Sequence, residues 1–138
     1  GLLDGEDSAR AHFHAGLLRQ KLGQWINARA HLSLAISRSG DRGLETVARQ
    51  RLQSRGFSLQ FGAFSKSDNA RSAATRLATT ARRAGLGSPH VLRSTMAGDA
   101  SVLYLVQAGW FASYEAARSA EARLAVDDVL IVPVTRVR

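Results

Sequence analysis

The residues SLQFGAF (58–64) and LVQAGWF (105–111) spell Gln-x-Gly-x-Phe twice in one chain. Each copy follows an apolar run and precedes a segment rich in Ala and Arg. When residues 57–77 are aligned with residues 104–124, nine of the 21 positions are identical and no gap is needed. Self-similarity in a single register indicates an internal repeat of one structural unit. We therefore predict that the chain contains two copies of one supersecondary module.

Each copy of the module begins with a strand that leads into a helix. Apolar residues alternate with polar or small ones in residues 57–61, the period-2 pattern of a strand buried on one face, and residues 102–108 form the matching strand. Apolar residues then recur at helical spacing in residues 70–81 and 117–124. Both copies thus predict the order strand then helix.

A turn followed by a short strand within residues 87–94, and a final strand over residues 129–134, complete the two copies with a second strand each. A loop over residues 95–101, with Gly and Asp at its tip, suits a hairpin between the copies. Pro133 cannot donate a ladder hydrogen bond, which places the last strand at a sheet edge. The predicted order is β-α-β-β-α-β, a four-stranded antiparallel sheet with both helices on one face. We assign this α+β domain to residues 56–138.

Residues 1–55 have a helical pattern throughout. Apolar residues share one helical face before Gly23 and another after it, and a third helix is expected over residues 42–54. The run AGLLRQKLGQWINARAHLSLAI (15–36) resembles one tetratricopeptide repeat, in which small residues let two antiparallel helices approach closely. A generic helical hairpin explains the same pattern. The prediction is a three-helix segment ahead of the sheet domain.

Composition limits the classes of function. The formal net charge is +8, and 17 of the 19 basic residues are Arg, which favours a polyanionic partner, although a solvated Arg-rich surface explains the charge equally well. The absence of Cys excludes disulfides, thiolate metal sites and Cys nucleophiles. No apolar run approaches the roughly 20 residues of a membrane-spanning helix. We expect that any signal or anchor segment is missing from this chain, which does not begin with Met.

No residue pattern points to catalysis. The four histidines lack the spacing of a metal site, and the adjacent Asp127 and Asp128 cannot converge on one bond as paired catalytic carboxylates do. Phosphate-loop and nucleophile motifs do not occur in the sequence. The sequence therefore predicts a protein that is not an enzyme and needs no metal or cofactor.

The sheet face away from the helices is expected to be open. If the apolar residues of the first strand face the helices, its open-face residues are Ser58, Gln60 and Gly62. In the third strand we expect Tyr104 to face the helices, which puts three residues on the open face (Leu103, Leu105 and Gln107). The opposite register would expose Tyr104. A glutamine amide both donates and accepts hydrogen bonds, as sugar hydroxyl and N-acetyl groups require.

The other repeated residues are assigned to structure. Gly62 and Gly109 suit sharp turns from strand to helix, and Phe64 and Phe111 are expected to fold back over the core. The repeated Gln is the one part of the motif that structure leaves unexplained.

Residues 57–135 resemble the SPOR (sporulation-related repeat) domain family. The resemblance rests on an aromatic-containing strand ending in Gln-x-Gly-x-Phe, on early Ala in the following helix, and on the Leu-Tyr-x-Val-x-x-Gly strand at residues 103–109. It implies a bacterial module of the periplasm or cell envelope with an RNP-like fold. The implied ligands are peptidoglycan glycan strands stripped of stem peptides, such as septal material made during division.

The resemblance also implies a set of binding residues. Gln60 matches the family's binding glutamine. Ala63 stands where other members often have Ser, and Leu103 and Leu105 stand where others carry an aromatic residue and an Arg. Arg93 would compensate for the missing charge if it faced the same way. The predicted glycan-binding residues are Gln60, Ser58, Ala63, Leu103, Leu105, Gln107 and Arg93.

Two other functions are left open. An RNA-recognition motif shares this topology and basic charge, but it needs aromatic residues on its central strands where this chain has Leu103 and Leu105, so no nucleic-acid partner is expected. A scaffolding role, in which the helical segment grips a protein partner, is compatible with glycan binding. The partners predicted are therefore peptidoglycan glycan strands and a protein bound through residues 1–55.

Overall fold

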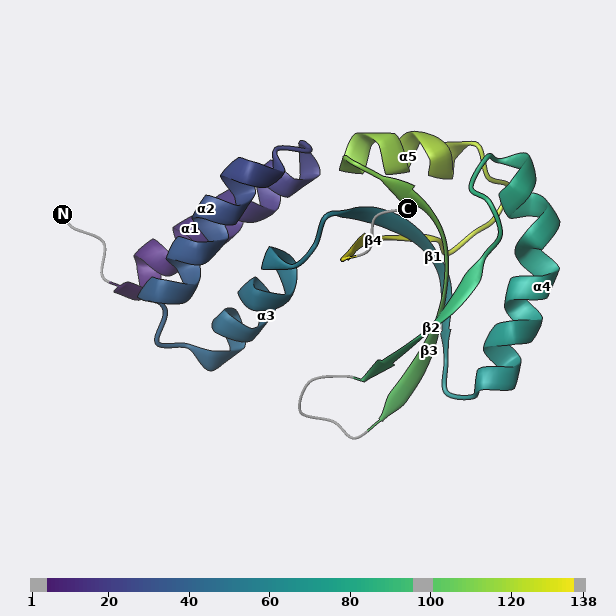
Figure 1. Ribbon diagram of the computed structural model, residues 1–138, viewed down its shortest axis with the longest axis horizontal. Helices are drawn as coiled ribbons and strands as arrows, with labels where there is room; N and C mark the ends of the chain where they lie inside the picture. The colour runs from purple at the N-terminus through teal and green to yellow at the C-terminus, as the bar shows by residue number, and fades with distance from the viewer. Residues whose placement is uncertain (1–4, 96–100, 136–138) are drawn as a thin grey trace. The chain divides into compact units, whose positions relative to one another are not determined.

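The computed structural model describes residues 5–95 and 101–135, and the elements found there follow the predicted order (Figure 1). Gly98 and Asp99, the expected hairpin tip, lie outside the described residues. The fold is α+β with a four-stranded antiparallel sheet, as predicted. The elements are α1 (Gly5–Lys21), α2 (Trp25–Arg38), α3 (Arg42–Leu52), β1 (Gly56–Phe64), α4 (Ser67–Arg83), β2 (His90–Thr95), β3 (Val102–Phe111), α5 (Tyr114–Ala122) and β4 (Leu130–Val134).

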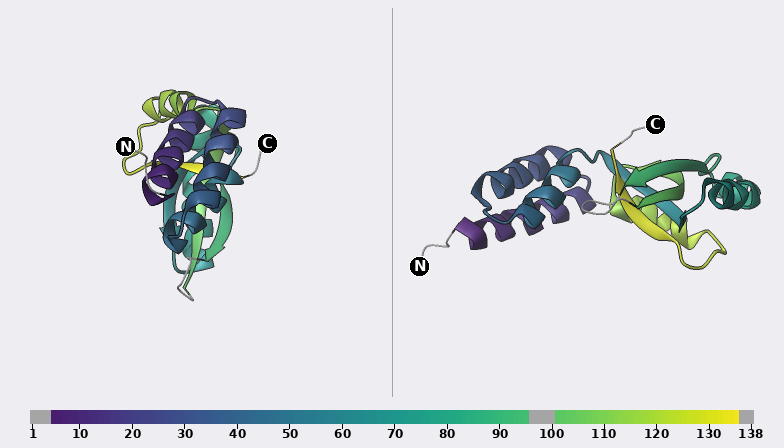
Figure 2. Two further views of the ribbon diagram at one scale, coloured as in Figure 1. Left: turned by 90° about the vertical axis from the view of Figure 1, so that its left-hand side faces the viewer. Right: turned by 90° about the horizontal axis from the view of Figure 1, so that it is seen from below.

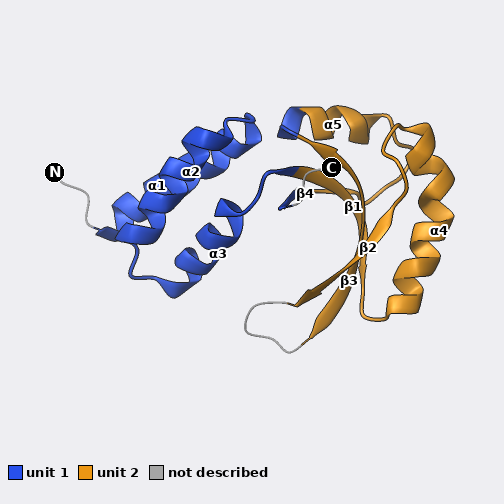
Figure 3. Ribbon diagram, in the orientation of Figure 1, with its two compact units in different colours: residues 1–56, 112–115, 133–138 blue, residues 57–111, 116–132 orange. Residues whose placement is uncertain are grey.

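The chain forms two compact units, coloured separately in Figure 3. The first unit consists of residues 1–56, 112–115 and 133–138, and the second consists of residues 57–111 and 116–132. The first unit therefore holds α1 to α3, and the second holds most of the sheet together with α4. The domain boundary between residues 55 and 56 stays a prediction.

In the first unit, α1 and α2 lie side by side along their lengths (Figure 2). Gly16 is buried against Leu32, and a Cβ added to Gly16 would lie 2.7 Å from Leu32 Cγ. The absence of a side chain at Gly16 thus lets the two helices approach closely. The turn between them contains Gly23 with φ 77°, a left-handed conformation that favours Gly.

The helix α3 is tied to α1 by a buried glutamine. Gln20 is 2% exposed, and its Nε2 donates to the Arg51 carbonyl oxygen at 2.6 Å. At the other end of α3, the Asp41 side chain accepts hydrogen bonds from the backbone N–H groups of Gly43 and Leu44. These bonds satisfy polar groups that helix ends and buried amides would otherwise leave unpaired.

The strands of the sheet are ordered β2-β3-β1-β4, so β4 lies at an edge, as Pro133 predicts. The helices α4 and α5 lie on one side of the curved sheet (Figure 1). Beneath α4, the fully buried Val106 packs with Ala70 and Ala73, and the Tyr104 ring joins this core. The predicted register of β3 is therefore confirmed, because Tyr104 and Val106 both face the helices.

The pairing between β1 and β3 shifts register at two bulges. Gln60 pairs with Gln107 whereas Gly62 pairs with Val106, so β1 contains one extra residue, Phe61. The bulge resets the alternation of β1 and turns Gly62 toward the helix-covered face. The prediction that Gly62 belongs to the open face is therefore wrong, since regular alternation does not anticipate a bulge.

Both repeated glycines make room for the phenylalanine two residues later. A Cβ added to Gly62 would lie 2.9 Å from the Phe64 ring, and one added to Gly109 would lie 2.9 Å from the Phe111 ring. The two rings fold back over the glycines, and the Phe64 ring packs against the core beneath α4, as predicted for it. The glycines themselves lie within β1 and β3 rather than at corners between strand and helix.

Candidate functional site on the open face of the sheet

Cross-strand pairing arranges the open face in rows. Tyr104 and Val106 face α4, so the alternating residues of β3 face the other way, and their partners on β1 and β2 share that direction. We call His90, Gln107 and Gln60 the polar row and Leu92, Leu105 and Ala63 the apolar row. Ser94 and Leu103 form a further pair beyond the apolar row.

The two repeated glutamines meet in the polar row although they are 47 positions apart in the chain. Gln107 Nε2 donates to Gln60 Oε1 at 3.1 Å. Gln107 is 4% exposed, whereas Gln60 is partly exposed. The bond fixes the Gln60 amide in one orientation and does not use its NH2 donors. Gln60 is thus the presented amide, and Gln107 positions it.

Ser58 is not part of this surface. It is 2% exposed, and its Oγ donates to the Ala108 carbonyl oxygen at 3.1 Å. Ala108 lies next to the β3 bulge, where the regular pairing of the two strands is interrupted. The expectation that Ser58 contacts a glycan is therefore wrong, because its hydroxyl is buried and hydrogen-bonded within the sheet.

Arg93 also lies elsewhere. It pairs with Tyr104 and so points to the face that α4 covers. The expectation that Arg93 supplies a charge to the open face is wrong, and the polar and apolar rows contain no acidic or basic residue other than His90. The sequence could not show which side chains of β2 face the helices, because the neighbouring residues Val91 and Leu92 are both apolar.

Sequence reasoning missed three residues of β2 that the sheet brings to the open face: His90, Leu92 and Ser94. His90 stands opposite Gln107, and Leu92 stands opposite Leu105. The one available signal was the alternation within HVLRST (90–95), and it fits either direction equally well. Pairing with β3 was needed to choose between them.

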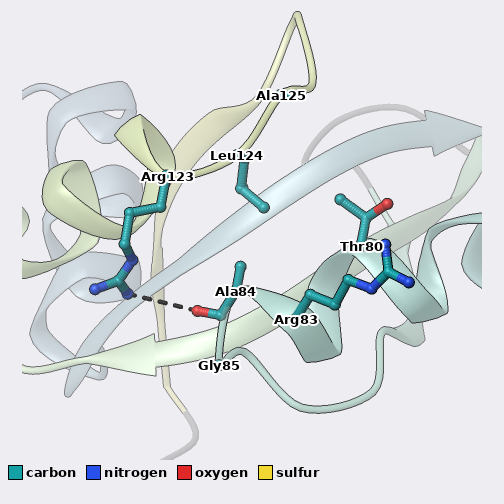
Figure 4. Close-up of a pocket in the computed structure, with 7 residues that line it drawn as sticks. All are labelled: Thr80, Arg83, Ala84, Gly85, Arg123, Leu124 and Ala125. Carbon is teal, nitrogen blue, oxygen red and sulfur yellow. Dashed lines mark hydrogen bonds between the residues drawn. The ribbon is translucent and has the colours of Figure 1, made fainter.

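A hollow of about 660 Å³ lies where α4 ends beside the segment that follows α5 (Figure 4). Arg123 Nη2 donates to the Ala84 carbonyl oxygen at 3.5 Å, so this guanidinium caps the end of α4. Figure 4 shows the Arg83 side chain extending away from Arg123. The two cations do not converge on one point, and the hollow is not a built anion site.

The described residues, 5–95 and 101–135, include no group of three or more His, Cys, Asp or Glu side chains that could hold a metal ion. Two histidines do meet: His12 Nδ1 lies 3.0 Å from His31 Nδ1, with the cationic Arg38 beside His12. In the same part of the chain, no helix has the length and apolar character needed to cross a bilayer.

Comparison with known proteins gives a family match for most of the part of the chain that forms the sheet. A model of the SPOR domain family matches residues 53–131, which is more than half of the chain and includes all of the open face described above. Neither a curated protein nor a solved structure matches the chain.

Proposed function

Because the chain belongs to the SPOR domain family, whose members bind peptidoglycan in the bacterial cell envelope, we propose that its open face binds peptidoglycan glycan strands and prefers strands without stem peptides. The observation that carries this proposal is the polar row lying directly beside the apolar row. The Gln60 amide supplies donors for sugar hydroxyl and N-acetyl oxygens. Leu92, Leu105 and Ala63 supply an apolar floor for the C–H faces of the sugar rings.

The size of the rows suits a sugar chain. Neighbouring rows are two residues apart along β2 and β3, which is roughly 7 Å, and three residues apart along β1, which contains the bulge. One sugar can therefore contact an amide of the polar row and a leucine of the apolar row together. The site is small and shallow, so we expect modest affinity that increases when several modules bind the same strand.

The preference for bare strands follows from shape in this proposal. A stem peptide on the lactyl group of muramic acid would collide with a sheet surface that must approach the sugar rings closely. The rows contain no Lys or Arg to attract the lactyl carboxylate that removal of the peptide exposes. Steric exclusion, rather than charge, is thus the proposed basis of selectivity.

Co-sedimentation with purified sacculi tests the proposal. We expect the full chain to bind amidase-treated sacculi and to bind intact ones less. Gln60→Ala should weaken binding roughly three- to tenfold, the cost of losing one neutral hydrogen bond. Gln50→Ala, which changes an exposed glutamine of α3, is the matched control and should bind as the parent does. Equal binding to both kinds of sacculi would refute the preference for bare strands, and full binding by Gln60→Ala would remove Gln60 from the site.

A scaffolding role is the second candidate, because the first unit exposes large apolar side chains. Ile26 of α2 is 87% exposed, and Leu18 of α1 and Leu22 of the turn after it are more than half exposed. Exposed apolar side chains are typical of a protein-binding surface when they lie together, and these three are spaced four residues apart in the chain. Ile26→Asn should abolish binding of a protein partner and leave sacculus binding unchanged. Gln60→Ala should weaken sacculus binding and leave binding of the protein partner unchanged. An RNA-binding role is disfavoured, because leucines and amides occupy the central positions that stacking aromatics would need.

A further inference from the structure

The positive charge of α4 lies on the solvent side of that helix. Four arginines and one aspartate occur in its 17 residues, and all four arginines are exposed: Arg71, Arg76, Arg82 and Arg83. Arg93 points to the same side of the sheet, since it pairs with Tyr104 beneath α4, and it is exposed as well. We call these five arginines the cationic face. The polar and apolar rows lie on the opposite side of the sheet.

The charge of the cationic face is only partly balanced within α4, whose one acidic residue, Asp68, lies three positions before Arg71. Arg76, Arg82 and Arg83 have no acidic residue three or four positions away in the chain. By contrast, Arg49 of α3 pairs with Glu45 at 3.0 Å. Arg82 does bond to Ser88 Oγ, at 3.2 and 3.3 Å, but that hydroxyl carries no charge. The repulsion among these guanidinium groups would be relieved by an external array of anions.

The side chains between the arginines indicate that this helix face contacts a surface without inserting into it. The exposed residues Ser72, Thr75 and Thr79 separate the arginines of α4, so this face presents short polar side chains and charges. A helix that enters the acyl region of a bilayer needs Leu, Phe or Trp on the inserting face. The cationic face therefore suits a surface that it touches but does not penetrate.

The spacing of the arginines favours an extended anionic surface over a single anion. Arg71 and Arg83 are twelve residues apart, which is about 18 Å along a helix. No single phosphate or carboxylate spans that distance, and Arg83 and Arg123 do not converge in the hollow at the end of α4. A layer of phosphate groups can engage several guanidinium groups at once.

We propose that the cationic face docks on the anionic phosphate headgroups of a lipid bilayer, while the opposite face of the same sheet stays available to its own ligand. The contact is peripheral and electrostatic, and each arginine strengthens it roughly fivefold at low salt. Because it uses different residues, this docking does not depend on glycan binding.

Vesicle co-sedimentation of the full chain tests the proposal. We expect binding to vesicles of phosphatidylglycerol mixed with phosphatidylcholine, little binding to phosphatidylcholine alone, and loss of binding as salt rises. Arg71→Gln combined with Arg76→Gln should weaken binding roughly 25-fold, since two charges are removed. Both residues are exposed and glutamine keeps a similar helix propensity, so the fold should persist, which circular dichroism would verify.

The matched control is Arg10→Gln combined with Arg29→Gln, which removes the same charge from exposed positions of α1 and α2. The control should bind vesicles nearly as the parent does. Equal weakening by both pairs would overturn the proposal, because binding would then reflect net charge alone. Equal binding to both kinds of vesicle would also overturn it. Polyglutamate serves as a competing probe: if it binds through Arg71 and Arg76 while vesicles do not bind, the cationic face takes acidic polypeptides instead.

Discussion

The missing side chain of Gly62 decides where the Phe64 ring lies. A Cβ at this position would come within 2.9 Å of that ring, and Gly62 has no positive φ, so contact rather than backbone strain requires the glycine. We predict that Gly62→Ala lowers the free energy of unfolding by about 1–3 kcal/mol, the usual cost of overpacking a core. Chemical denaturation measures this change.

A double-mutant cycle with Phe64→Ala checks the cause. If the ring is responsible, adding Gly62→Ala to the Phe64→Ala variant should cost much less than adding it to the parent. Equal costs in both backgrounds would show that the contact with Phe64 is not the reason for the glycine.

Leu105 is the residue at which a charge could be restored to the open face. It lies in the apolar row next to Ala63, where other SPOR domains carry a positive residue according to the resemblance in sequence. Leu105→Arg should strengthen binding to amidase-treated sacculi on the order of two- to fivefold, because an exposed guanidinium would pair with the lactyl carboxylates. Leu130→Arg, on an exposed residue of β4, is the control for added charge. Equal gains from both variants would contradict this placement of the carboxylate.

At the scale of elements, the α1–α2 hairpin contains a contact that depends on pH. His12 and His31 approach at 3.0 Å and their rings stack, which requires at least one neutral ring. Burial, the Arg38 charge and His31 together hold the pKa of His12 below its usual value. A lowered pKa in the folded chain means that the unfolded chain binds more protons as pH falls through the usual histidine value of about 6.5.

We therefore predict that the hairpin loses stability as pH falls from about 6.5 toward the lowered pKa of His12, and that its full stability is present above that range. Thermal melting followed by helical circular dichroism measures the effect. His12→Asn should flatten this pH dependence, whereas His14→Asn, at an exposed position of α1, should retain it. A parent protein whose melting temperature is constant across this range would contradict the prediction.

At the scale of the whole molecule, the two sides of the sheet should respond differently to salt. The polar and apolar rows bind through amides and leucines, so sacculus binding should change little as ionic strength rises. The cationic face binds through guanidinium groups, and screening over about 8 Å at physiological ionic strength should weaken vesicle binding. Sedimentation with each target across a salt series measures both responses. A parallel loss of both activities would show that one surface serves both ligands.

The Gln-x-Gly-x-Phe repeat and the hydrophobic patterns around it predicted most of the fold of the sheet domain. Strand alternation, helical spacing and Pro133 together predicted the order of elements, the antiparallel sheet and the edge position of β4. These three signals can be read from the sequence because each depends only on residues close together in the chain. The register of β3 was also predictable, since Tyr104 and Val106 alternate with leucines that the open face can tolerate.

The composition of the open face was less predictable, because it depends on contacts between distant residues. The sequence by itself determined that Gln60 and Gln107 repeat and that Gly62 and Phe64 belong to the framework. Only the tertiary structure decided that the two glutamines form a hydrogen bond with each other, that Ser58 is buried and donates to the Ala108 carbonyl oxygen, and that Arg93 faces α4. A bulge shifts every later residue of a strand to the opposite face. In a strand such as β2, with apolar residues on both faces, pairing with a neighbouring strand decides which residues face the helices.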